Sequence, residues 1–145
     1  MSVRQILRQK GTYVLTITPD ITLGDAADLL TRRVVGALPV VEGARLVGMF
    51  SERTLAEAVA ARGPAALALP VRAVMDEAPT CPPDTSLRAL MARMTSRRLR
   101  HVLVVENGYL AGIVSVGDVV KHRLREVETE TGVLRDALTF ARAAA

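Results

Sequence analysis

Three residues suited to ligand chemistry, Ser115, Gly117 and Asp118, stand where a β-strand pattern gives way to a helix pattern. The first turn of a helix carries unpaired backbone N–H groups and a partial positive charge, so it can hold a phosphate. There, Gly117 lets a ligand approach the backbone, Ser115 can bond a phosphate or sugar oxygen, and Asp118 can accept from two vicinal hydroxyls. The Ser-x-x-Asp spacing is also that of a helix capping box, and the two interpretations are compatible because a ligand oxygen can replace the cap.

Basic residues cluster just before the apolar run Val102–Val105, at Arg97, Arg98, Arg100 and His101. A charge run is usually a solvated helix face, and Arg97 and Arg98 fit that description. Arg100 and His101 instead stand at the start of a strand, where cations can balance a phosphate. The net charge of +4 permits an anionic partner, whether nucleotide, nucleic acid or acidic protein. An aromatic content of 3% argues against a base-stacking nucleic-acid surface.

The chain repeats itself at an offset of 64 residues, from Thr16 to Thr54 against Thr80 to Asp118, without a gap. Several turn and helix-start residues are identical in the two copies: Pro19 and Pro83, Asp20 and Asp84, Gly48 and Gly112, Ser51 and Ser115. Because the register holds through every turn signal, the chain is a duplicated unit.

Each copy predicts the element order β-α-β-β-α. Apolar residues at helical spacing define the first helix of each copy: Leu23, Ala26, Ala27 and Leu30, then Leu87, Leu90, Met91 and Met94. Two β-rich runs follow, joined by the two-residue turns Gly43-Ala44 and Asn107-Gly108, which predict hairpins. A second helix starts at Ser51 or Ser115. At roughly 60 residues each, the copies are expected to bury their faces against one another as one pseudo-symmetric module.

The expected domain plan has a first repeat at 1–63, a linker at 64–70, a second repeat at 71–125 and a helical tail at 126–145. Met1–Lys10 and Val71–Asp76 are expected to be short helical lead-ins. The last helix carries apolar residues at heptad spacing: Val120, Leu124, Val127, Thr131, Leu134, Leu138 and Ala141. This stripe favours packing on a second copy, and Gly132 weakens the helix. His122 is expected to face solvent.

The remaining composition narrows the class of protein. The single cysteine, Cys81, cannot form an internal disulfide and is expected to be buried or idle, so a cytoplasmic location fits. Apolar stretches fall short of the roughly 18 residues that span a bilayer. No Ser/His/acid set, metal-ligand spacing or phosphate loop of the Walker type is present, so neither an enzyme nor a metal site is expected.

The doubled Thr-x-x-Pro-Asp, hairpin and Gly-x-x-Ser-x-x-Asp pattern resembles a tandem pair of CBS (cystathionine β-synthase-type) domains, a Bateman module, from about Val3 to Arg125. The resemblance implies an α/β (α+β) fold in which two βαββα repeats pack sheet to sheet, followed here by a long C-terminal helix. It also implies two clefts that take adenosine compounds as regulatory ligands: AMP, ADP, ATP, NAD(H) or S-adenosylmethionine. Such a module is expected to form a homodimer, to need no obligatory cofactor, and to sense energy state for a separate regulated protein.

The resemblance assigns ligand contacts in the second repeat to Thr80, Arg100, His101, Val102, Ser115, Gly117 and Asp118. A weaker site in the first repeat is assigned to Thr16, Ala37, Leu38, Ser51, Arg53 and Thr54. Asp118 would hold the ribose, whereas Thr54 stands at the equivalent position of the first repeat. A hydroxyl makes one neutral hydrogen bond where a carboxylate makes two charge-assisted ones, so the Asp118 cleft is predicted to bind more tightly. Arg53, in place of Gly117, could add a phosphate contact.

Two other classes stay open. A ligand-independent module would use the helix from Val120 to Ala141 to dimerise or dock on a partner. A nucleic-acid-binding protein is suggested by the net charge and the arginine cluster, but the scarcity of aromatic residues opposes it. Steep salt dependence without any nucleotide effect would identify the latter.

Overall fold

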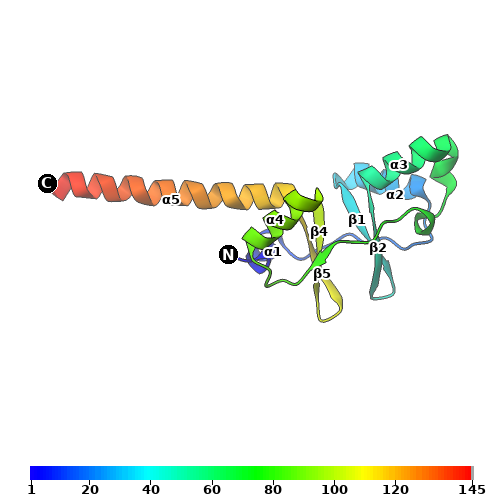
Figure 1. The fold of residues 1–145 in the computed structure, drawn as a ribbon, viewed down its shortest axis with the longest axis horizontal. Helices are drawn as coiled ribbons and strands as arrows, with labels where there is room; N and C mark the ends of the chain where they lie inside the picture. Colours follow the sequence, from blue (N-terminus) through cyan, green and yellow to red (C-terminus); the bar gives the residue numbers. More distant parts are fainter. Residues whose placement is uncertain (145) are drawn as a thin grey trace.

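The computed structural model describes residues 1–144 and shows a mixed α/β fold with two small sheets and a long C-terminal helix (Figure 1). The helices are α1 (Val3–Lys10), α2 (Leu23–Arg33), α3 (Glu52–Arg62), α4 (Leu87–Arg97) and α5 (Val116–Ala144), with 3-10 helices η1 (Gly63–Ala68) and η2 (Val71–Ala73). The strands are β1 (Ala37–Glu42), β2 (Arg45–Ser51), β3 (Thr80–Cys81), β4 (His101–Glu106) and β5 (Tyr109–Ser115). Within residues 1–144, none of the helices combines the length and apolar character that crossing a membrane requires.

Both predicted hairpins are confirmed, and they are near copies of each other. β1 pairs antiparallel with β2, and β4 with β5, with a bulge at the equivalent point of each ladder. Asn107 and Gly108 both have positive φ, 53° and 80°, as a type I′ turn requires, whereas Gly43 has φ 63° in the first hairpin. β2 and β5 lie next to each other, so the two hairpins stand side by side in Figure 1.

The predicted first strand is short in the second repeat and is reduced to a bridge in the first. In the second repeat it is the two-residue β3, which runs parallel to β4, and Leu103 N–H donates to the Pro79 carbonyl at 2.8 Å. In the first repeat only an isolated bridge remains, between Ile17 and Val40. Pro39 occupies the position of Leu103 and has no N–H, so the equivalent rung cannot form.

Each hydrophobic core takes its lead-in segment from the other repeat. Val3, Ile6 and Leu7 of α1 pack into the core built from α4, β4 and β5, whereas Ala66 and Val71 pack into the core of α2, β1 and β2. Cys81 is 1% exposed in the first of these cores, so the prediction of a buried thiol is confirmed. Because α1 crosses to the second repeat, neither core is complete without the other repeat.

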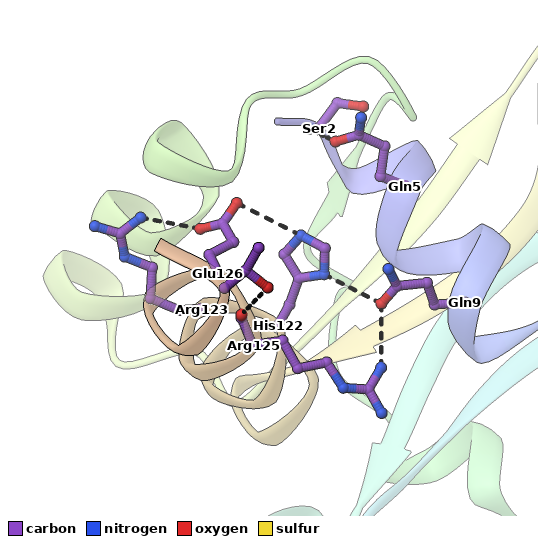
Figure 2. Close-up of polar contacts among 8 residues, drawn as sticks. Ser2, Gln5, Gln9, His122, Arg123, Arg125 and Glu126 are labelled. Carbon is purple, nitrogen blue, oxygen red and sulfur yellow. Dashed lines mark hydrogen bonds and ion pairs between the residues drawn. The ribbon is translucent and has the colours of Figure 1, made fainter. Parts of the chain in front are cut away.

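The prediction for His122 is wrong, because this side chain is 5% exposed. Val119, His122 and Glu126 follow one another at helical spacing on the face of α5 that packs on the body, and Val119 is also buried. Figure 2 shows His122 Nδ1 beside Gln9 Oε1 of α1 at 3.4 Å, and Nε2 3.8 Å from Glu126. Arg125 donates to the same Gln9 oxygen, so α1 anchors the first turns of α5.

Candidate functional site

A cleft of about 630 Å³ opens between the two repeats, a size that suits a small organic ligand. Both repeats and the segment that joins them contribute to its lining: Gly36, Met49, Ser51, Glu52, Arg53, Glu57, Asp76, Glu77, Pro79, Arg98, Leu99, Arg100 and His101. The structure therefore brings Ser51 and Arg53, predicted for one site, together with Arg100 and His101, predicted for the other.

The N-terminus of α3 opens into this cleft, and Ser51 caps it. Ser51 Oγ accepts a hydrogen bond from Thr54 N–H at 3.2 Å, and the Gly36 carbonyl accepts one from Glu52 N–H at 3.1 Å. These caps use the first and third N–H groups of the helix, and neither of them uses the second, that of Arg53. An anion at this position meets the positive end of the helix dipole.

A carboxylate that the sequence analysis missed, that of Asp76, lies at the same helix end. Thr54 is 3% exposed, and its hydroxyl donates to Asp76 Oδ2 at 2.9 Å. The backbone of Asp76 is held by Met49, whose N–H donates to the Asp76 carbonyl at 2.9 Å and whose carbonyl accepts from Asp76 N–H at 3.0 Å. Asp76 thus places an acid beside the threonine that stands where the second repeat has Asp118.

The charges around the cleft nearly cancel. Three arginines, Arg53, Arg98 and Arg100, face four carboxylates from Glu52, Glu57, Asp76 and Glu77. Arg53 Nε already lies 2.9 Å from Glu57 Oε1, although both side chains are exposed and free to rearrange. The lining therefore repels a chain of phosphates more strongly than a single phosphate.

His101 contributes hydrogen-bonding capacity to the cleft rather than charge. Burial lowers the pKa of His101 below its ordinary value of 6.5, and the nearby Lys10 cation lowers it further, against the opposing effect of Glu52 and Asp118. The imidazole is therefore neutral at pH 7. Gly36 lies close enough that a Cβ there would meet His101 Cε1 at 3.0 Å.

Ser115 and Asp118 form the predicted capping box at the start of α5. Asp118 Oδ2 accepts from Ser115 N–H at 2.9 Å, and Ser115 Oγ accepts from Asp118 N–H at 3.1 Å. Lys10 of α1, which the sequence analysis did not connect to this site, also donates to Asp118 Oδ2 at 2.6 Å and to the Ile113 carbonyl at 2.8 Å. Asp118 is absent from the described lining of the cleft.

The Lys10 contact decides the ionisation of Asp118. Burial by itself raises the pKa of this carboxyl, but the hydrogen bond and charge of Lys10, with the Ser115 N–H, outweigh it and bring the pKa below 3.8. Beside it, a Cβ on Gly117 would meet only Ser115 Oγ, at 3.6 Å, so the backbone there is open.

The other predicted contact residues lie elsewhere. Thr16 and Thr80 are exposed outside the cleft, and the Thr80 carbonyl accepts from Arg93 at 2.9 Å. Ala37, Leu38 and Val102 are core residues, exposed by 5%, 0% and 0%. Within residues 1–144, no three His, Cys, Asp or Glu side chains converge as a metal site requires.

The family model for the CBS domain matches residues 3–61 and 71–125. The CBS domain-containing protein YhcV of Bacillus subtilis is 34% identical over 114 residues, 78% of this chain and 81% of that protein. The crystal structure of the CBS-domain containing protein ATU1752 from Agrobacterium tumefaciens has a TM-score of 0.82 and 42% identity, and the match covers 85% of this chain and 99% of that one.

Two more distant structures contain bound adenosine compounds. A CBS domain protein from Pyrobaculum aerophilum, complexed with AMP, has 24% identity and a TM-score of 0.76 over 90% of this chain and 99% of that one. The CBS domain pair of protein MJ0100, in complex with 5-methylthioadenosine and S-adenosyl-L-methionine, has 22% identity and a TM-score of 0.76 over 87% and 98%. At these identities the likeness is one of fold.

Proposed function

Because the chain belongs to the CBS domain family as a tandem pair, we propose that it is a regulatory module that binds an adenosine nucleotide between its repeats. The observation that carries the proposal is the cleft where the N-terminus of α3, the Asp76 carboxylate and the arginines of the second repeat meet. A phosphate, a ribose and an apolar base each find a suitable partner there. The AMP and S-adenosylmethionine complexes of distant relatives point to the same class of ligand.

The phosphate is assigned to the Arg53 N–H at the start of α3, with Arg100 facing it across the cleft. Arg53 can turn its guanidinium from Glu57 to the phosphate, because that surface pair is exposed and of low strength. The ribose is assigned to Asp76. One carboxylate oxygen of Asp76 accepts a hydrogen bond from Thr54, and the carboxylate keeps acceptor capacity for vicinal hydroxyls. Met49, Pro79 and Leu99 supply the apolar surface for the base.

The charge balance of the cleft favours AMP among the nucleotides. The four carboxylates of the cleft repel additional phosphates, and they already oppose the positive charges of its three arginines. We therefore expect AMP to bind more tightly than ADP, and ADP more tightly than ATP. NAD(H) and S-adenosylmethionine share the adenosine part and belong in the same test.

A second nucleotide site is assigned to Asp118, on condition that Lys10 moves away. A ribose would have to displace Lys10, which holds the same carboxylate oxygen at 2.6 Å. The sequence-based prediction that this site is the tighter one stays a prediction. We place the first ligand in the cleft between the repeats, which Ser51 and Arg100 line.

Regulation follows from the position of the ligand. A nucleotide that touches α3 of one repeat and Arg100 of the other changes how firmly the repeats are held together. The change is passed to a separate partner protein. The competing function, a ligand-independent interaction module, is favoured by the exposed apolar residues of α5.

The experiment is a thermal-unfolding panel with AMP, ADP, ATP, NADH, S-adenosylmethionine and a short DNA duplex. A ligand at 100 times its Kd adds about 2.7 kcal/mol to the unfolding free energy, or roughly 5–10 °C in Tm for a domain of this size. We expect AMP to give the largest shift. Absence of any shift with every adenosine compound overturns the proposal, and a shift with DNA alone moves the function to nucleic-acid binding.

A further inference from the structure

An exposed apolar stripe runs along α5 on a different face from the one that packs on the body. Its large members are Val120, Leu124, Val127, Leu134 and Leu138, which are exposed by 50%, 57%, 45%, 65% and 61%. Val119 and His122 lie only one or two residues away in sequence but are buried, with exposed fractions of 4% and 5%. Figure 2 shows the body-facing side, where Gln9 and Glu126 flank His122, so the stripe is left free by the fold.

The rest of α5 projects beyond the body, where it has no core of its own (Figure 1). Side chains from Val127 to Ala143 are exposed, apart from the partly covered Gly132. A solvated helix with this many exposed apolar residues is only marginally stable alone, so a partner that covers the stripe is needed.

We propose that α5 pairs with α5 of a second copy of this chain as a parallel, in-register, two-stranded coiled coil from Val120 to Ala141. The stripe steps by four and three residues, which is the seam of a left-handed coiled coil. Charged residues border it closely on both sides, at Arg123, Glu128, Glu130 and Arg135. The stripe itself has the width of a coiled-coil seam, and Val133 and Phe140, exposed by 62% and 76%, lie outside it.

The bordering charges identify the second copy as the partner. In a parallel pair, the residue just before Leu124 or Thr131 in one helix meets the residue five places further along in the other helix. Glu130 then faces Arg135 of the second copy, and Arg123, which lies 2.9 Å from Glu126 of its own helix, also faces Glu128 of the second copy. Two-fold symmetry repeats both attractive pairs, so the surface is complementary to itself.

The antiparallel alternative is disfavoured by the same residues. The register that sets Leu124 opposite Leu134 places the two-fold axis beside residue 129. Glu128 and Glu130 then lie next to their own counterparts, where like charges repel. Thr131, the one polar seam residue, faces another Thr131 in the parallel pair but the apolar Val127 in the antiparallel pair.

The first test is the mass of the full chain in solution by sedimentation and light scattering, with charge variants of the projecting helix. Glu130→Arg turns attraction into repulsion twice per dimer and is expected to weaken dimerisation about tenfold or more. Glu130→Arg with Arg135→Glu restores the pairing and the dimer. Asp136→Arg, on the outer face of the same exposed helix, is the matched control and leaves the dimer intact.

The second test fixes direction and register by mild oxidation. Leu134→Cys is expected to form a disulfide-linked dimer, because the two copies meet at this position, whereas Asp136→Cys and the wild type, with its buried Cys81, are not. A monomer, a trimer or tetramer, a dimer indifferent to Glu130→Arg, or a disulfide formed only between Leu124→Cys and Leu134→Cys chains overturns the proposal. None of the described cleft-lining residues lies in α5, so the AMP shift of the Glu130→Arg chain reports on the proposed function separately.

Discussion

Breaking the contact between Lys10 and Asp118 is expected to lower the unfolding free energy by about 1 kcal/mol at pH 7. Lys10 Nζ lies 2.6 Å from Asp118 Oδ2, and the two side chains are 34% and 23% exposed. Exposed pairs contribute about 0.2–1 kcal/mol, and hydrogen bonds to charged groups about 1.5–3 kcal/mol, so partial burial places this pair between them. Lys10→Met keeps the aliphatic stem and removes the donors, and Asp118→Asn keeps an acceptor for Ser115 N–H.

The assay is urea unfolding of the wild type, both single variants and the double variant, from which a double-mutant cycle gives the coupling energy. The coupling depends on pH with a definite sign. Because the folded pKa of Asp118 lies below 3.8, its contribution is fully present above that pH and disappears as the pH falls further. Arg32→Met, which breaks the exposed pair with Asp28, is the control and should cost under about 0.5 kcal/mol. Strictly additive single variants at pH 7 would refute the reasoning.

Three further predictions concern stability. Val34 has φ 53° and is 88% exposed, so Val34→Asn should add about 1 kcal/mol of unfolding free energy; a loss would show that the left-handed conformation is not strained. A Cβ on Gly48 would lie 3.0 Å from the Asp76 carbonyl, so Gly48→Ala should cost about 1–3 kcal/mol and weaken AMP binding, whereas Gly132→Ala, with open space around it, should do neither. His101 is held neutral by burial and by Lys10, so wild-type stability should fall as the pH drops below 6.5, and His101→Asn should remove that part of the slope; an unchanged slope contradicts it.

Local features of the chain were predictable because their signals are local. Asn107-Gly108 specifies a hairpin turn through two positive φ angles, and the Ser51 and Ser115 caps mark helix starts. The doubled pattern, which stays in register from Thr16 to Thr54 at an offset of 64 residues, then predicted the tandem arrangement and the mixed α/β fold. His122 was misplaced because its charged neighbours in sequence suggested solvent, whereas its spacing from Val119 is that of a buried face.

The crossing of the lead-in segments could not be predicted. Val3, Ile6 and Leu7 make an apolar face that suits either repeat, since the two cores are nearly equivalent. Only the crossing brings Lys10 to Asp118 and Asp76 to Thr54, two contacts between residues far apart in sequence. Each contact changes the expected binding site. The Lys10 contact occupies the carboxylate of Asp118, and the Thr54 contact brings the carboxylate of Asp76 to the first repeat.

The central claim is that the cleft beside Asp76 binds an adenosine nucleotide, and isothermal titration calorimetry with AMP tests it most directly. We predict one AMP per chain, about tenfold weaker binding by Asp76→Asn, and unchanged binding by Asp28→Asn on the exposed face of α2. A wild-type chain that gives no binding heat, or an Asp76→Asn chain that binds AMP as tightly as the wild type, would contradict the claim.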